Sequence, residues 1–254
     1  MPFLRYLCYL YLVYNIALIL FPAIFAIIAY LLGSINFAIL ITKRATGEDI
    51  RSHGSKNAGM TNVMRTVGAK SGVLTLVGDA VKAVVAVSLG KFLLPFILET
   101  LYPAQNELLM YIYGAYLCGF FVILGHILPI FFRFKGGKGI VTIISALLVI
   151  NWKLFFVMLI IWLIIFMISR IISLASVLAC SLYPFILYFT YNFLSYPDIN
   201  GCDVLMSFIG IPLQWFETIC GTLMVSMVIF MHRSNIARLI KGEEKKISVK
   251  KGKE

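Results

Sequence analysis

Residues 49–65, DIRSHGSKNAGMTNVMR, have the composition of an anion-binding turn. The segment combines glycines with short hydroxyl and amide side chains, namely Ser55, Asn57, Thr61 and Asn62. Glycine permits the backbone angles at which successive N–H groups converge on an anion. Arg51, Lys56 and Arg65 add positive charge, and the planar guanidinium of arginine matches two phosphate oxygens. The segment predicts a site for a phosphate-carrying ligand; a cytosolic connector whose cations only fix orientation is the alternative.

A second polar cluster, FKGGKGI at residues 134–140, comes immediately before an apolar run. Gly136, Gly137 and Gly139 allow the backbone to close on a ligand, and the start of a helix presents unpaired N–H groups. The two lysines add charge. These are the parts of a phosphate site, although the Walker A pattern G-x-x-x-x-G-K-[ST] is absent. A positively charged anchor before a flexible helix start is the alternative.

A third cluster, HRSNIAR at residues 232–238, follows the last apolar run. If that helix continues, His232 and Asn235 are three residues apart and share a face, so both side chains reach one ligand. Histidine can move a proton near neutral pH, and asparagine can donate and accept hydrogen bonds. The alternative is a histidine that merely ends a helix.

Two charged residues lie inside an apolar run, where charges are costly and are usually paired or functional. Asp79 and Lys82 are three positions apart, which predicts a structural pair that either neutralises itself or braces the neighbouring loop. Ser176 and His126 also lie in apolar runs and are weaker signals, because such residues usually bond their own backbone or pack.

The composition indicates an integral membrane protein. The chain has 254 residues, of which 61% are hydrophobic and 13% charged, against about 25% charged in a typical soluble domain. The net charge of +11 therefore favours anionic lipid over nucleic acid as a partner. Five cysteines without a C-x-x-C, and three histidines without a close companion, predict neither a disulfide framework nor a metal site.

Apolar runs predict an all-α membrane protein with about seven transmembrane helices. The runs cover residues 23–42, 72–98, 108–132, 139–151, 154–168, 171–194 and 212–231. Residues 1–22 form an apolar N-terminal extension, 23–240 the polytopic domain and 241–254 a basic cytosolic tail. Within the extension, residues 3–21 suit an interfacial helix, an uncleaved signal-like segment or part of one long bent helix.

The distribution of cations predicts the orientation. With seven helices, 18 of the 22 lysines and arginines fall on one side of the membrane, which the positive-inside rule makes the cytosol. Segments 99–107 and 195–203, assigned to the other side, carry only acidic residues among their charged ones. All three polar clusters then lie at the cytosolic face.

Taken together, the motifs resemble those of the acyl-phosphate:glycerol-3-phosphate acyltransferases, the PlsY family of bacterial membranes. The first motif comprises G-S-I at 33–35, D-I-R at 49–51 and G-S-x-N-x-G-x-T-N-V-x-R at 54–65. The second is G-H-x-x-P-x-F-x-x-F-K-G-G-K-G at 125–139, and the third is H-R-x-N-I-x-R-L-x-x-G-x-E at 232–244. The resemblance spans nearly the whole chain, from residue 32 to residue 244.

The resemblance implies a seven-helix enzyme of the bacterial cell (inner) membrane with its site and C-terminus in the cytoplasm. It would transfer a fatty acyl group from acyl phosphate to the 1-hydroxyl of sn-glycerol 3-phosphate, giving lysophosphatidic acid and phosphate for phospholipid synthesis, without cofactor or metal. The catalytic residues implied are Ser55, Arg65, His232 and Asn235. The substrate-binding residues implied are Asn57, Thr61, Asn62, Gly136, Gly137, Lys138, Gly139 and Ser176. Glu244 would stabilise the last motif.

The chain departs from the family pattern at a few positions. Lys56 stands where glycine is usual, and either tightens the phosphate pocket or constrains the turn. Met60, Asn36 and Ala83 replace a usual alanine, proline and glycine. Two other function classes fit part of the pattern: a transporter of anions or lipid phosphates, and a phosphatase or phosphotransferase acting on lipid phosphates. Clustering of polar residues on one side disfavours transport. The residues leave the oligomeric state open.

Overall fold

The computed structural model describes residues 2–101, 107–193 and 213–246, and every regular element in these ranges is helical. The α-helices are α1 (Pro2–Ser34), α2 (Phe37–Thr46), α3 (Met60–Thr66), α4 (Ala69–Ser88), α5 (Leu94–Leu101), α6 (Glu107–Ile127), α7 (Ile140–Ile150), α8 (Trp152–Ser169), α9 (Ile172–Phe193), α10 (Leu213–Met231) and α11 (Arg233–Ile240). Short 3₁₀ turns η1 (Ile50–Ser52) and η3 (Ile130–Phe132) and a π-helical stretch η2 (Leu89–Leu93) complete the list. The all-helical prediction is confirmed.

Six helical segments in these ranges are long and apolar enough to cross a membrane. They are Ile16–Thr46, Ala69–Thr100, Met110–Phe132, Trp152–Ser169, Ile172–Thr190 and Gln214–Met231. The predicted run 139–151 corresponds to the shorter apolar helix α7, whose 11 residues extend about 16 Å. The predicted connections 99–107 and 195–203 lie wholly or largely outside the described residues, as does much of the tail.

The prediction of one helix over residues 23–42 is wrong. The helix α1 has 33 residues and passes through Pro22 without a break, so residues 3–21 belong to the same helix as the first span. At 1.5 Å per residue it is about 50 Å long. The chain leaves the helix at Ile35, because Asn36 accepts a hydrogen bond from the Ile39 amide (3.0 Å) and so starts α2. An asparagine, whose side chain can bond nearby backbone amides in this way, favours a helix start over a helix interior.

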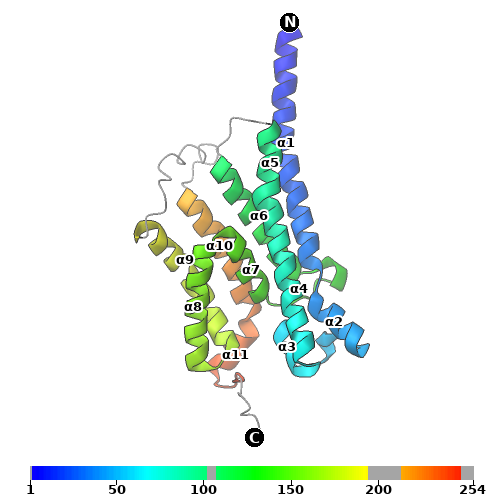
Figure 1. Cartoon of the computed structure of the whole chain (residues 1–254), viewed down its shortest axis with the longest axis vertical. Coiled ribbons are helices and arrows are strands. Elements are labelled where there is room, and N and C mark those ends of the chain that lie inside the picture. The colour runs from blue at the N-terminus through cyan, green and yellow to red at the C-terminus, as the bar shows by residue number, and fades with distance from the viewer. Residues whose placement is uncertain (1, 102–106, 194–212, 247–254) are drawn as a thin grey trace.

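The short helix α7 lies inside the bundle (Figure 1), where it packs against α4, α6, α8 and α10. The ammonium of Lys91, from η2, donates hydrogen bonds to the carbonyls of Val149 (2.6 Å) and Ile150 (3.4 Å) at the C-terminal end of α7. A cation at this end satisfies carbonyls that lack helical partners and complements the helix dipole. These contacts allow a helix too short to span a bilayer to end within the protein.

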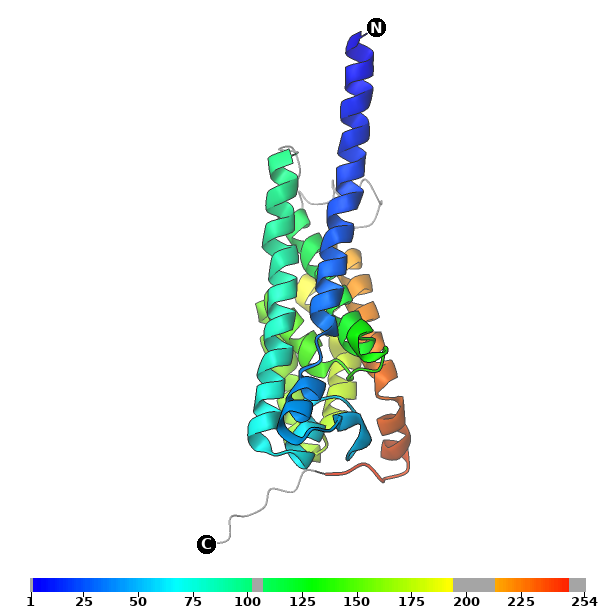
Figure 2. The ribbon, with the colours of Figure 1, turned by 90° about the vertical axis from the view of Figure 1, so that its right-hand side faces the viewer.

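The helices α2, α3 and α11 lie at one end of the bundle, opposite the N-terminal end of α1 (Figures 1 and 2). The helix α1 packs mainly against α6, and α9 packs against α8 and α10. The first and third polar clusters are carried by α3 and α11 together with their adjoining loops. The fold therefore brings polar segments from distant parts of the sequence to the same end.

Candidate functional site

Asn62 is the centre of the first polar loop. Its side-chain oxygen accepts a hydrogen bond from the Ser55 amide (3.0 Å). Its side-chain nitrogen donates to the carbonyls of His53 (3.0 Å), Asn57 (3.1 Å) and Ile50 (3.4 Å). Asn62 is buried, with 3% of its surface exposed, and a buried amide needs such partners. Its contacts hold the loop in shape around the neighbouring residues.

The remaining predicted ligands of this loop are more accessible. Ser55 and Arg65 are exposed, whereas Asn57 and Thr61 are half-buried. Within the described residues, the Ser55 hydroxyl and the Arg65 guanidinium make no hydrogen bond or ion pair. These two groups are therefore available to a ligand. The structure does not join their side chains by hydrogen bonds to those of the second and third clusters.

The second loop folds back on the end of α6. The amide of Gly136 donates to the Ile127 carbonyl (3.1 Å), and the amide of Gly137 donates to the His126 carbonyl (3.2 Å). A Cβ at Gly137 would lie 2.7 Å from the Ala58 carbonyl oxygen and would also collide with the His126 ring. Glycine at this position thus allows the second loop to touch both the first loop and α6.

The last glycine of this loop, Gly139, has a φ of +87° and immediately precedes α7. This left-handed conformation suits glycine, because it has no Cβ. The first amides of a helix lack helical partners, and together with the helix dipole they attract an anion. The start of α7 and the neighbouring Lys138 are therefore suited to hold a phosphate.

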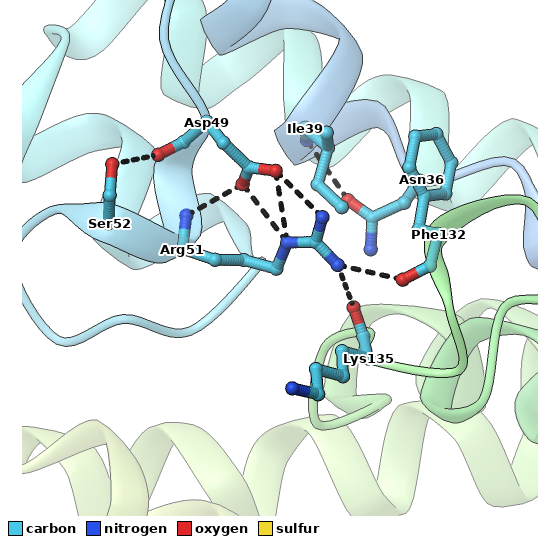
Figure 3. Close-up of polar contacts among 7 residues, drawn as sticks. All are labelled: Asn36, Ile39, Asp49, Arg51, Ser52, Phe132 and Lys135. Atoms are coloured by element: carbon cyan, nitrogen blue, oxygen red, sulfur yellow. Dashed lines mark hydrogen bonds and ion pairs between the residues drawn. The ribbon is translucent and has the colours of Figure 1, made fainter.

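A direct side-chain contact joins the first and second loops (Figure 3). One nitrogen of Arg51, Nη1, donates to the carbonyls of Phe132 (2.8 Å) and Lys135 (3.0 Å). The opposite edge of the guanidinium binds the carboxylate of Asp49, with Nη2 2.7 Å from Oδ2. These contacts lower the pKa of Asp49, chiefly through the side-chain hydrogen bonds from Arg51. The charge of Arg51 is therefore already balanced within the protein.

A second network joins the second loop to the C-terminal motif. The ammonium of Lys138 donates to the side-chain oxygen of Asn235. The side-chain nitrogen of Asn235 donates to Oε1 of Glu244 (2.6 Å), which also accepts a hydrogen bond from the Ser173 hydroxyl (2.7 Å). Arg238 donates to Oε2 of the same carboxylate (2.6 Å). The network thus connects the loop before α7, the helix α11 and the start of α9.

Burial and hydrogen bonds shift the pKa values of Lys138 and Glu244 in this network. Burial lowers the pKa of Lys138 to about 8, although the charge of Glu244 acts in the opposite direction. Partial burial would raise the pKa of Glu244, but the hydrogen bonds from Ser173, Asn235 and Arg238 lower it overall. An anionic ligand beside Lys138 would raise the pKa of this lysine again, because it favours the charged ammonium.

His232 lies at a break between two helices. The helix α10 ends at Met231 and α11 begins at Arg233, so the two helices are not continuous as the shared-face argument required. Nevertheless both His232 and Asn235 are buried, with 3% and 5% of their surface exposed. Burial, together with the nearby Lys138 charge, lowers the pKa of His232 to about 4, although the hydrogen bond to Val228 acts in the opposite direction.

The hydrogen bond of His232 fixes its tautomer. The Nδ1 atom lies 2.8 Å from the carbonyl oxygen of Val228, which can only accept. Nδ1 must therefore carry the hydrogen, and in the neutral ring Nε2 keeps a lone pair. At neutral pH the side chain of His232 is a hydrogen-bond acceptor at Nε2.

An apolar cavity lies among α6, α7, α8, α9 and α10. Its wall consists almost entirely of apolar and aromatic side chains, including Ile140, Leu147, Met158, Ala179 and Met224. Ser176 also lines it, and its hydroxyl accepts a hydrogen bond from Trp162 Nε1 (3.1 Å). Ser173, which binds Glu244, lies one helical turn before Ser176. The cavity is therefore adjacent to the Lys138–Asn235–Glu244 network.

The predicted pair of Asp79 and Lys82 forms, with Nζ 2.8 Å from Oδ1, and it includes two further groups. Lys82 also contacts Nδ1 of His126 (2.9 Å) and donates to the Ile35 carbonyl (2.6 Å). All three side chains are buried. The group joins α4, the end of α6 and the break after α1. The His126 ring also lies directly against the backbone of Gly137.

Sequence reasoning missed three features of the site. Ser173 had a detectable signal, because it lies three residues before Ser176 on the same helix. The Trp162 contact and the carbonyl contacts of Arg51 have no such signal, since their partners are distant in sequence. In the described ranges no group of three or more histidine, cysteine or acidic residues is arranged to hold a metal ion.

Comparison with known proteins gives consistent matches. Residues 23–242 match the family model of glycerol-3-phosphate acyltransferase. The chain is 36% identical to the glycerol-3-phosphate acyltransferase of Bartonella quintana (strain Toulouse), with 87% of this chain and 89% of the relative covered. It is 37% identical to that of Herminiimonas arsenicoxydans, with 92% and 98% covered.

The fold also matches crystal structures of PlsY, described as an integral membrane glycerol 3-phosphate acyltransferase. The glycerol 3-phosphate form is 28% identical, with a TM-score of 0.66 and coverage of 89% of this chain and 96% of that one. The lysophosphatidic acid form is 27% identical, with a TM-score of 0.64 and coverage of 89% and 95%. The chain belongs to the glycerol-3-phosphate acyltransferase family, as an integral membrane enzyme of the PlsY type.

Proposed function

We propose that the protein transfers a fatty acyl group from acyl phosphate to the 1-hydroxyl of sn-glycerol 3-phosphate, releasing 1-acylglycerol 3-phosphate and phosphate. The observation that carries this proposal is the position of Lys138 relative to the apolar cavity. Only Gly139 separates Lys138 from Ile140, which lines the cavity. A cation for phosphate and a wall for a hydrocarbon chain therefore adjoin.

This adjacency favours acyl phosphate over a thioester donor. In an acyl phosphate the anionic group is bonded directly to the acyl carbonyl, so both parts must be bound within a few ångströms. In a thioester the neighbouring group is an uncharged pantetheine arm, which an ammonium beside the carbonyl would not attract electrostatically. A membrane-embedded cavity also accepts a lipid-soluble chain without a soluble carrier.

The residues can be given roles in this reaction. Lys138 and the first amides of α7 hold the donor phosphate and stabilise its developing charge as the bond to the acyl carbon breaks. Asn235 and Glu244 keep the ammonium in place. Gly136, Gly137 and Gly139 allow the backbone to approach the phosphate, and Ser176 marks the polar edge of the cavity.

The first loop is suited to the acceptor. We assign Arg65, Ser55, Asn57 and Thr61 to the phosphate and hydroxyls of glycerol 3-phosphate, because these side chains are exposed or half-buried. Asn62 acts indirectly by shaping the loop. His232 accepts a hydrogen bond from the 1-hydroxyl through Nε2. A bond forms between the hydroxyl oxygen and the acyl carbon, and the proton leaves with the departing phosphate.

No cofactor is required, since an acyl phosphate is already activated and the protein need only bind, align and stabilise charge. We infer that the end of the bundle that carries the motifs faces the cytoplasm, because most of the lysines and arginines lie in or beside the loops and short helices at this end. A single cysteine at exposed Ser234, in a chain with its five natural cysteines replaced, tests this orientation. An impermeant thiol reagent should label it only after the cells are opened.

Purified protein in lipid nanodiscs tests the reaction. Labelled glycerol 3-phosphate is supplied with palmitoyl phosphate, palmitoyl-CoA or palmitoyl-acyl carrier protein. The proposal expects lysophosphatidic acid and phosphate in equal amounts with palmitoyl phosphate alone. The 1-deoxy analogue of glycerol 3-phosphate should give no product. Equal rates with palmitoyl-CoA would overturn the donor assignment while leaving the family assignment intact.

A further inference from the structure

Arg51 uses its donors on the protein itself. The Nε atom lies 3.0 Å from Oδ1 of Asp49 and Nη2 lies 2.7 Å from Oδ2, a two-pronged pair that fixes the plane of the guanidinium. The Nη1 atom then points at the second loop, where it donates to the carbonyls of Phe132 and Lys135 (Figure 3). Only about a quarter of its side chain is exposed, at 26%.

The two carbonyls lie on either side of a strained turn in the chain. Arg133 and Phe134, which lie between them, have φ angles of 59° and 56°. This left-handed conformation is unfavourable for a residue with a Cβ. The turn also has two internal hydrogen bonds, from the amides of Phe134 (2.9 Å) and Lys135 (3.4 Å). Arg51 thus binds the peptide groups on both sides of two unfavourable residues.

The strained turn leads directly into the phosphate loop. Gly136 and Gly137 follow Lys135 and are tied to the end of α6, and Lys138 comes next. A change in the turn must therefore move the backbone that places the Lys138 ammonium. On the other side, Asp49 accepts a hydrogen bond from the Arg51 amide (2.9 Å), so the same pair also shapes the start of the first loop.

We propose that Asp49 and Arg51 form a positioning clamp that holds the strained turn at Arg133 and Phe134, and so fixes Lys138 relative to the first loop. The inference rests on the proposed function in so far as Lys138 binds a substrate phosphate. The clamp differs from direct phosphate binding in its chemistry. A clamp needs the forked guanidinium with its fixed geometry, whereas a phosphate ligand needs mainly the positive charge.

Variants at Arg51 separate these two roles. Arg51→Met should lower kcat/KM by about 100-fold, the size expected when a catalytic group is displaced by about 1 Å. Arg51→Lys should behave like Arg51→Met, because a lysine cannot bind the carboxylate and both carbonyls together. Lys70→Met removes an exposed cation from the same end of the protein and should leave the rate unchanged. Activity close to wild type in Arg51→Lys would overturn the clamp.

A second-site change tests the strain. Glycine adopts the left-handed conformation without the penalty, so Arg133→Gly should restore at least about tenfold of the activity lost in Arg51→Met. Arg133→Ala is the matched control, because it removes the same charge and side chain but keeps the strain. It should restore nothing. Equal rescue by both variants, or rescue by neither, would contradict the proposal.

Hydrogen exchange gives a readout that does not depend on the reaction. The amides of Gly136 and Gly137 should exchange faster in Arg51→Met than in the wild type, and Arg133→Gly but not Arg133→Ala should slow them again. Unchanged amide exchange at Gly136 and Gly137 in Arg51→Met would contradict the clamp even if acyl phosphate is the donor. Conversely, if the donor assignment fails, the exchange measurement still decides whether the clamp exists.

Discussion

The Lys138 ammonium donates a hydrogen bond to the side-chain oxygen of Asn235, a residue 97 positions away in the sequence. Asn235 in turn donates to Glu244, so the position of one ammonium depends on the last described segment of the chain. A cation held this way has little freedom to move when substrate charge changes. Preorganised charge of this kind is an effective way of stabilising a transition state.

Replacing Lys138 by alanine should remove most transfer activity without unfolding the protein. Loss of one preorganised charge contact typically lowers kcat by about 100- to 1000-fold. Lys135→Ala is the matched control, because that side chain is an exposed lysine in the same loop. It should keep a rate near that of the wild type. Similar losses in both variants, measured with palmitoyl phosphate, would mean that Lys138 acts only through the general charge of the loop.

The protonation of Lys138 should depend on substrate. In the free protein its pKa is lowered to about 8, so at pH 8.5 much of it is uncharged. A bound phosphate favours the ammonium and raises this pKa, and binding must therefore take up a proton between about pH 8 and 9. Calorimetry of inorganic phosphate binding, as a stand-in for the donor phosphate, in two buffers of different ionisation enthalpy measures the uptake. Lys138→Ala should show none, and binding without proton uptake would count against the ligand role.

The low pKa of His232 makes the stability of the folded protein depend on pH under acidic conditions. The group takes up a proton near pH 4 when folded and near 6.5 when unfolded. Between these values the unfolded chain binds more protons, so the free energy of unfolding falls as the pH drops from 6.5 towards 4. The slope from this group approaches about 1.4 kcal/mol per pH unit. His232→Gln should remove this contribution, which chemical denaturation at a series of pH values can measure.

The same shift predicts the pH–rate profile. Protonation at Nε2 would remove the acceptor for the substrate hydroxyl, so the acid limb of kcat/KM due to His232 should lie near pH 4. An acid limb near pH 6.5 that vanishes in His232→Gln would contradict the buried, neutral state of this side chain.

The sequence predicted the chemistry of the site better than its geometry. The three polar clusters and the pairing of Asp79 with Lys82 follow from residue types and short spacings, which local rules capture. The boundary after Ser34 was missed because apolar residues continue on both sides of it, and the break depends on Asn36 and on the distant Lys82. Apolar periodicity alone carries no information about such long-range partners.

The role of Arg51 shows the same limit. From sequence it is one of three cations in an anion-binding segment, but in the structure Asp49 neutralises it and Nη1 donates to two carbonyls of another loop. Asn62 likewise is a residue type that often binds ligands, but its side chain is hydrogen-bonded to backbone groups of its own loop. Whether a polar side chain faces a substrate or the protein depends on tertiary contacts.

The unusual Lys56 should cost stability. Its φ of 58° is left-handed, a conformation that favours glycine over a residue with a Cβ. Lys56→Gly should therefore stabilise the protein by roughly 1 kcal/mol while keeping activity. Lys56→Ala removes the same charge without relieving the strain, so it should not stabilise. If thermal denaturation shows Lys56→Ala to be as stable as Lys56→Gly, charge repulsion rather than backbone strain is the cost.

Filling the apolar cavity should discriminate between acyl donors by length. Ala179 lines the cavity and is 5% exposed, so Ala179→Leu adds bulk where the proposed hydrocarbon chain lies. The variant should raise KM for palmitoyl phosphate by about tenfold, the size expected for a clash of one or two methylene groups, yet leave KM for glycerol 3-phosphate and for butyryl phosphate unchanged. Overpacking typically costs about 1–3 kcal/mol of stability, so the folding of the variant is measured alongside its kinetics. Leu178→Phe is the matched control, because it adds bulk at the neighbouring position, which is 42% exposed on the outside of the bundle. If Ala179→Leu slows short and long donors equally, the cavity does not hold the acyl chain.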